Sequence, residues 1–394
     1  MKFNFTDILR APRIGFSAKK IWVATLGLLI GTVLYSILTY CAYLTCFDWN
    51  WISIWQTYKL IPLPIIGETS FAWYNWALWI LGLALFVGVN FISIGAISKL
   101  TIEQLRGDEF YEITDAVKYS MKQWKAVMLS PLVLMIFIAS LLVVGFVCGL
   151  IGRIPYAGQL FAGMFFIPVA FGSIFIVYLG IVLLVSLIIG PSIAGSSESD
   201  VFDTLFEVFS CLNDQTWRLI LWEILVGLFA IIGTLVLGWI VKQGLVLMEW
   251  GCGLWAGPRG WWDIIWTRGI CYLPAIPTID WIEKVVSRVA PVLIIAPPTW
   301  SVGNWAEIVG GFLVGISFYF ILFFVMAYGV SIWSAGQTLI YTVLVKMKDE
   351  KNLLEKIEEE FEEEKIEEET TEKKIEEHKE EEKHDKDKEK EKKH

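Results

Sequence analysis

The residues that most often carry catalysis are unevenly placed in this chain, because its three histidines all lie near the C-terminal end, at His378, His384 and His394. Ser-His-Asp and Cys-His hydrolases, histidine-ligated zinc and imidazole proton relays all need this side chain. Residues 1–348 contain no histidine, and the sequence has no C-x-x-C, Gly-rich phosphate loop or H-E-x-x-H motif. We therefore predict no catalytic, cofactor-binding or metal-binding residue, and a protein that is not an enzyme. Carboxylate or lysine chemistry stays open.

Two polar residues interrupt otherwise apolar stretches, and each is a candidate for a transport path. Ionisable and amide side chains at bilayer depth often line the route of an ion or a solute. Glu223 lies five residues after Arg218, so its ordinary explanation is pairing with that arginine or snorkelling to the surface. Asn90 has the alternative role of a hydrogen bond between helices.

Acidic residues recur at spacings of three and four in two segments, which puts them on one face of a helix in each. Such a face is a candidate cation site or a docking surface for a basic protein partner, and its ordinary explanation is a solvated surface. The residues of these acidic stripes are Asp108, Glu112 and Asp115 in the first segment, and Asp200, Asp203 and Glu207 in the second.

Cys252 and Cys271 are the two cysteines that fall in the same predicted loop. In an oxidising compartment a disulfide bond between them would close a loop of about 20 residues and contribute roughly 3 kcal/mol in a chain-entropy model. The alternative is that both remain thiols. The other four cysteines are dispersed and are expected to pack as small apolar residues.

The elements that must position these residues are long apolar segments, since 56% of the chain is hydrophobic and the excess is concentrated in runs. Lipid accepts only backbones that satisfy their own hydrogen bonds, so segments of this length must be helices. The sequence predicts an all-α polytopic membrane domain over residues 1–348, with six spans at 21–46, 71–98, 126–149, 161–190, 218–239 and 308–330.

Charge divides the chain and gives it an orientation. Of the net charge of −9, the Glu/Lys-rich tail at 349–394 contributes −10, with 22 acidic residues against 12 lysines. Lys and Arg concentrate before the first span and between the second and third, which places both regions and both termini in the cytoplasm. Without a basic groove, nucleic-acid binding is not expected. We predict a bacterial inner-membrane location, with the lipid bilayer as one partner.

Two connections predicted on the cytoplasmic side resemble each other. Each begins with an acidic residue, continues with the periodicity of an amphipathic helix, and ends on Trp plus a cation, at Trp124-Lys125 and at Trp217-Arg218. The pattern favours two parallel repeats. On the other side, the outer segment 240–307 is rich in Trp and Pro, and its part at 251–305 suits an interfacial or re-entrant segment better than a seventh span.

Three short stretches carry a family resemblance: the entry Ile8-Leu9-Arg10-Ala11-Pro12-Arg13, the loop Gly190-Pro191-x-Ile193-Ala194 with Asp200-x-Phe202-Asp203, and the exit Gln337-Thr338-Leu339-Ile340-Tyr341. They resemble an uncharacterised family of bacterial polytopic membrane proteins. More distantly, the paired inner helices are similar to membrane domains attached to glycerophosphodiester phosphodiesterases. The resemblance implies the fold and transfers no activity.

These observations favour a non-enzymatic scaffold or accessory subunit that presents its acidic helices and its tail to a cytoplasmic protein partner. The alternative is a transporter or lipid-handling protein built from the two parallel repeats, with Glu223 and Asn90 on its path.

Overall fold

The structure is a computed structural model of the 394-residue chain. It describes residues 3–46, 51, 54–55, 61–62, 71–197, 199–256, 260–272, 304–349 and 352–355. The chain divides into two units, Met1–Glu350 and Lys351–His394. Most of the predicted tail, and residues 273–303 of the predicted interfacial segment, lie outside the described residues.

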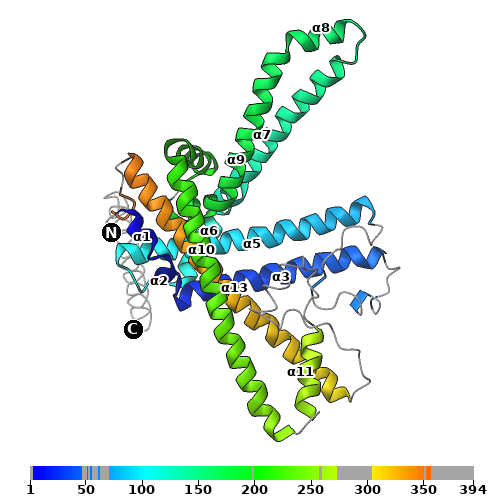
Figure 1. Ribbon diagram of the computed structural model, residues 1–394, viewed down its shortest axis with the longest axis vertical. Helices are drawn as coiled ribbons and strands as arrows, with labels where there is room; N and C mark the ends of the chain where they lie inside the picture. Colours follow the sequence, from blue (N-terminus) through cyan, green and yellow to red (C-terminus); the bar gives the residue numbers. More distant parts are fainter. Residues whose placement is uncertain are drawn as a thin grey trace, which may run out of the picture. The chain divides into compact units, whose positions relative to one another are not determined.

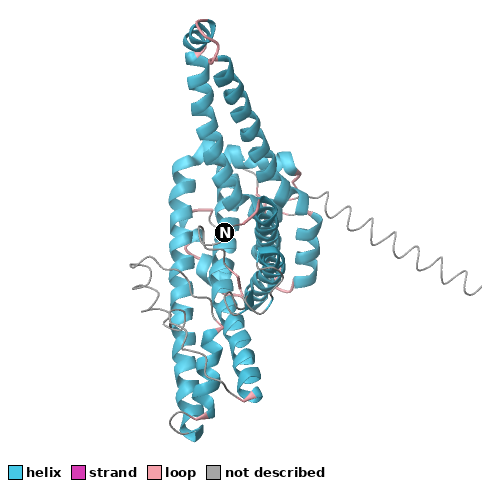
Figure 2. Cartoon of the chain, turned by 90° about the vertical axis from the view of Figure 1, so that its right-hand side faces the viewer, coloured by secondary structure: helices cyan, strands magenta, loops and turns pink. Residues whose placement is uncertain are grey.

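The described part of the chain contains helices and loops but no strand (Figure 2). Its helices are α1 Phe5–Ile8, α2 Ala11–Gly15, α3 Ala18–Cys46, α5 Trp73–Arg106, α6 Ile113–Lys122, α7 Trp124–Ile151, α8 Ala157–Met164, α9 Phe166–Ser196, α10 Val201–Ala256, α11 Trp261–Cys271 and α13 Trp305–Asp349.

Six of the described helices, α3, α5, α7, α9, α10 and α13, are long and apolar enough to cross a membrane. They contain most of each predicted span, in the predicted order. The prediction of an all-α polytopic membrane protein is therefore confirmed. Each segment supplies a run of about 20 or more mostly apolar residues, which is the length that a helix needs to cross the bilayer.

The helices extend further than the predicted spans. The span predicted at 218–239 is part of α10, which has 56 residues and continues to Ala256. No proline interrupts the chain between Val201 and Ala256, so nothing forces the helix to stop at the membrane surface. The outer segment predicted at 240–307 therefore begins as a continuation of this helix, up to Ala256. Likewise α13 runs 19 residues past the predicted end at Val330, to Asp349.

Prolines in α9 act differently from the expectation. The predicted end at Gly190 is wrong, because α9 continues through Pro191 to Ser196. Proline removes one backbone hydrogen bond in a helix, yet α9 continues through Pro191, and Gly190 to Gly195 are buried against the neighbouring helices. At the other end, a break at Phe165 separates α8 from α9, and Pro168 sits in the first turn of α9, where its missing N–H is tolerated.

Both predicted amphipathic helices are present. The first is α6, which ends before Gln123 and is followed at once by α7. The second is the beginning of α10, where a kink with non-helical backbone angles at Gln215 precedes Trp217 and Arg218. In both cases the helix is interrupted at a glutamine one or two residues before the Trp-cation pair. This similarity agrees with the repeat that the sequence suggests.

The core of the first unit lies around the C-terminal half of α13. This half contacts α2, α3, α5, α9 and α10, and its side chains from Ser331 to Val345 are almost all buried. By contrast, α7 and α9 run side by side as a hairpin joined through α8, which contacts only these two of the described helices (Figure 1). Of the two candidate path residues, Glu223 is positioned by the region around α13.

Candidate functional site

The contact between α10 and α13 contains the buried carboxyl group of Glu223. Gln337 of α13 donates a short hydrogen bond from its Nε2 to Oε2 of Glu223. Arg218 does not reach this carboxylate: its Nη1 donates to Oε1 of Gln215 at 2.9 Å, and its guanidinium lies 5.2 Å from the Trp217 ring. The expected Arg218–Glu223 pairing is therefore wrong, because the kink at Gln215 supplies the arginine with a nearer partner.

Part of this pair has no hydrogen-bond partner. Oε1 of Glu223 and Oε1 of Gln337 are both buried and unpartnered. Gln337 is fully buried, and Glu223 lies about 12 Å along α10 from the kink, at 1.5 Å per residue. Buried polar atoms usually have a hydrogen-bond partner. Two unpartnered acceptor oxygens on one contacting pair therefore indicate that a donor hydrogen belongs between them.

A second polar cluster contains one serine from each of three helices. The hydroxyl of Ser98 donates to Ser192 Oγ at 3.0 Å and lies 3.2 Å from Ser334 Oγ, which donates to the carbonyl of Ile94 at 3.0 Å. Inside a bilayer the hydrophobic effect does not draw helices together, so hydrogen bonds of this kind help to join them. The cluster fixes α5, α9 and α13 against one another.

Asn90 of α5 does not make the predicted bond between helices. Its Nδ2 donates to the carbonyl of Phe86, four residues earlier in the same helix, at 2.8 Å. Its side chain still packs against α3, where a Cβ added at Gly31 would lie 3.1 Å from Asn90 Nδ2. Asn90 and Glu223 thus belong to different helix contacts, α3–α5 and α10–α13, and the described contacts do not join them into one path.

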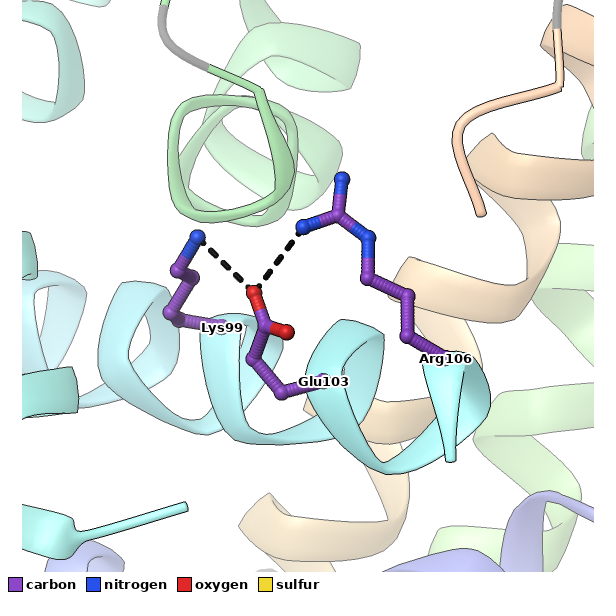
Figure 3. Close-up of polar contacts among 3 residues, drawn as sticks. All are labelled: Lys99, Glu103 and Arg106. Carbon is purple, nitrogen blue, oxygen red and sulfur yellow. Dashed lines mark hydrogen bonds and ion pairs between the residues drawn. The ribbon is translucent and has the colours of Figure 1, made fainter. Parts of the chain in front are cut away.

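An ion group that sequence reasoning missed lies on the last turns of α5. Glu103 Oε1 accepts from Lys99 Nζ and from Arg106 Nη1, each at 3.0 Å (Figure 3). The side chain of Glu103 is 8% exposed and those of its two partners are 14% exposed. Lys99 also lies 4.4 Å from the Tyr119 ring of α6. The signal was available, because Lys99, Glu103 and Arg106 have the i, i+4 and i, i+3 spacing of helical ion pairs.

The predicted acidic stripes lie mostly on the surface, and they do not all share a helix face as predicted, because Asp108 and Glu112 precede α6 and Asp200 precedes α10. Asp115 pairs with Lys118 at 3.3 Å where both are exposed, and Asp108 accepts from the backbone N–H of Phe110 at 2.9 Å. Glu112, Asp200 and Asp203 are exposed as well, and Glu207 approaches Lys348 of α13 at 3.5 Å. No group of three or more potential metal ligands occurs among the described residues. The solvated reading of these stripes fits this arrangement.

Cys252 and Cys271 are not joined by a disulfide bond in the structure. Cys252 is half-buried near the end of α10, and Cys271 is buried at the end of α11. The disulfide bond remains a prediction for an oxidising compartment. The structure has the other arrangement that the sequence allows, in which both cysteines are thiols.

A polar pocket of about 290 Å³ lies where α3 meets the connection between α5 and α6. Lys20 is buried there and donates from Nζ to Oε1 of Gln104 at 2.7 Å and to the carbonyl of Ile14 at 3.1 Å. Tyr111 lines the same pocket, and burial, followed by the carboxylates of Glu103, Asp115 and Asp108, raises the pKa of its hydroxyl. Lys20 therefore helps to attach the N-terminal segment to α5.

A second pocket, of about 510 Å³, is almost entirely apolar and lies between α3 and α13. Its lining includes Val33, Ile37 and Tyr40 of α3 and Ile316 and Phe320 of α13. A space of this character at membrane depth suits an apolar group such as a lipid acyl chain.

No protein-family model, curated protein or solved structure matches this chain. The two resemblances drawn from short motifs therefore stay predictions. The structure does give their residues a physical role, because Pro191, Ile193 and Ala194 of the loop motif and Gln337 and Tyr341 of the exit motif are buried in the core.

Proposed function

We propose that this chain is a non-enzymatic scaffold or accessory subunit of the bacterial inner membrane, with both termini in the cytoplasm. The distribution of Lys and Arg supports the orientation, and the resemblance to a bacterial membrane protein family supports the location. The absence of histidine from residues 1–348 supports a role in binding rather than in catalysis. Besides the predicted cytoplasmic contacts through the tail and the acidic helices, an accessory subunit can contact a partner subunit through a surface within the membrane.

The hairpin of α7, α8 and α9 carries this proposal. In the most apolar stretch of α7 only 6% of the residues are buried, against 44% in the corresponding stretch of α3. Large apolar side chains are exposed along it, among them Ile136, Phe137, Leu142, Val143, Phe146 and Phe171. The hairpin therefore offers a long apolar surface at membrane depth that the other described helices leave uncovered.

Two glycines on this surface have a spacing that is typical of contacts between membrane helices. Gly145 and Gly149 of α7 have the G-x-x-x-G spacing, and nothing lies within 4 Å of a Cβ added at either of them. Small residues at this spacing let two membrane helices approach closely. The partner we propose is a transmembrane helix of another subunit, packed on α7 at Gly145 and Gly149.

Photo-crosslinking in native membranes tests this contact. A crosslinking residue in place of the exposed Phe146 of α7 should give a discrete protein adduct, and the double variant Gly145→Leu/Gly149→Leu should reduce its yield at least tenfold, because leucine side chains block close approach. The matched control is Ile231 of α10, also exposed and inside the predicted span, where the same crosslinker should yield lipid adducts alone. Lipid adducts alone at Phe146 would contradict the proposal.

The orientation is tested by labelling single cysteines in a cysteine-free chain. Trp261→Cys, on the predicted outer side, should react with a membrane-impermeant maleimide in intact cells, whereas Phe110→Cys should react only after the membrane is opened. Both side chains are exposed, at 56% and 90%, so access to the reagent decides the outcome. The reverse pattern would overturn the orientation.

One observation favours the alternative function, that of a transporter or lipid-handling protein. The apolar pocket of about 510 Å³ between α3 and α13 has room for part of an acyl chain. Lipid transfer or solute flux catalysed by the purified chain in proteoliposomes would favour this function over a scaffold.

A further inference from the structure

The contact of Glu223 with Gln337 lies in a closely packed, antiparallel seam between α10 and α13. Gly336 packs on Val226, where an added Cβ would lie 2.8 Å from Val226 Cγ2, and Gly329 packs on Ala230 and Thr234 farther along. These two glycines of α13 leave little space between the helices. The packing beside Glu223 and Gln337 therefore holds the two side chains in contact.

If the carboxyl group of Glu223 is ionised, Glu223 and Gln337 cannot satisfy all of their hydrogen-bonding atoms. An ionised carboxylate only accepts, and an amide offers two N–H donors and one carbonyl acceptor. Gln337 Nε2 donates to Oε2 of Glu223, which leaves Oε1 of each side chain as a buried acceptor without a donor. An unpaired charge buried at this depth would be costly in addition.

Among the residues that the structure describes, the Glu223 carboxylate contacts Gln337, and the charged groups nearest to it have other partners. On its own helix Arg218 contacts Gln215 and Met347, and Asp214 accepts from Ser210. At the end of α13, Lys348 contacts Glu207.

The other packed elements contribute few charges. On α1, Asp7 pairs with Arg10 at 3.4 Å, and Arg13 of α2 is exposed. Helix α9 contains no charged residue, α7 contains Lys125 alone, and α11 carries Asp263 and Arg268, the latter 3.8 Å from Glu307.

We propose that Glu223 is a proton-binding site, where the carboxylate takes up one proton from water and holds it on Oε1 as a neutral carboxylic acid. This O–H donates to Oε1 of Gln337, while the amide N–H donates to the carbonyl oxygen Oε2. One proton thus satisfies both orphaned oxygens, closes a cyclic acid–amide pair and removes the buried charge. The inference stands independently of the scaffold role, because it concerns the α10–α13 seam and not the α7–α9 hairpin.

Infrared spectroscopy of the full chain in lipid tests this proposal. At neutral pH the carbonyl stretch of a protonated carboxylic acid should be present in the wild-type protein and lost in Glu223→Gln. Glu207→Gln, at a partly exposed carboxylate paired with Lys348, is the matched control and should leave the band unchanged. A wild-type spectrum at neutral pH with carboxylate bands alone would overturn the proposal.

A second variant keeps the test decisive if Glu223→Gln does not fold. Gln337→Leu removes the amide that donates to the acid carbonyl, so the acid band should persist and shift to higher frequency. Raising the pH of the wild-type protein should convert the same band into carboxylate absorption. An acid band that Gln337→Leu leaves in place at the same frequency would contradict the assignment to this pair.

Discussion

Replacing Glu103 by glutamine should lower the free energy of unfolding by about 3–5 kcal/mol, the cost typical of removing one partner from a buried ion group. Glu103 is the one carboxylate that Lys99 and Arg106 share, and all three side chains are at least 86% buried. Glutamine keeps the size of the side chain but not its charge, so Lys99 and Arg106 would lose the carboxylate that lies between them. Unfolding in mixed micelles, followed by tryptophan fluorescence, measures the loss.

Asp115→Asn is the matched control for this variant. It removes one carboxylate from an ion pair with the same i, i+3 spacing, but Asp115 and Lys118 are 51% and 78% exposed. Exposed pairs contribute about 0–1 kcal/mol because water and salt screen them, so the control should unfold almost as the wild-type protein does. Equal losses in the two variants would show that burial of the Glu103 group has no energetic consequence.

The transmembrane helices could be predicted from the sequence because the bilayer imposes a local condition. Each segment must satisfy its own backbone and present about 20 apolar residues, and both requirements are visible in consecutive letters. This is why α3 and α7 coincide closely with the predicted 21–46 and 126–149, whereas the ends of α5, α9 and α10 do not. Outside the hydrocarbon no such condition applies, so the sequence gives a weaker signal for the helix ends than for the spans.

The candidate site depends on pairs that are far apart in the chain. Glu223 and Gln337 are separated by 114 residues, and no local pattern links them. The sequence instead suggested the nearest cation, Arg218, and the kink at Gln215 that redirects this arginine depends on tertiary packing. The Glu103 group was visible in its spacing, but its burial depends on the helices packed around the end of α5.

The largest effect of a single added carbon is expected at Gly195 in α9. A Cβ at this position would lie 2.8 Å from the Cα of Gly95 and 2.9 Å from its carbonyl carbon, besides contacting its carbonyl oxygen. These atoms belong to the backbone of α5, so no side-chain rotation can relieve the contact. Gly195→Ala should therefore separate α9 from α5 and lower the free energy of unfolding by about 3 kcal/mol, the upper part of the range for overpacking.

Gly180→Ala, in the same helix, is the control that isolates this contact. Nothing lies within 4 Å of a Cβ at Gly180, so this variant should gain the helix propensity of alanine over glycine, up to about 1 kcal/mol, without a steric cost. Because Gly195→Ala receives the same propensity term, the difference between the two variants measures the approach of α5 and α9. A similar midpoint for both in the same micellar unfolding experiment would mean that the helices are not held this closely, and the serine cluster that depends on this approach would be in doubt with it.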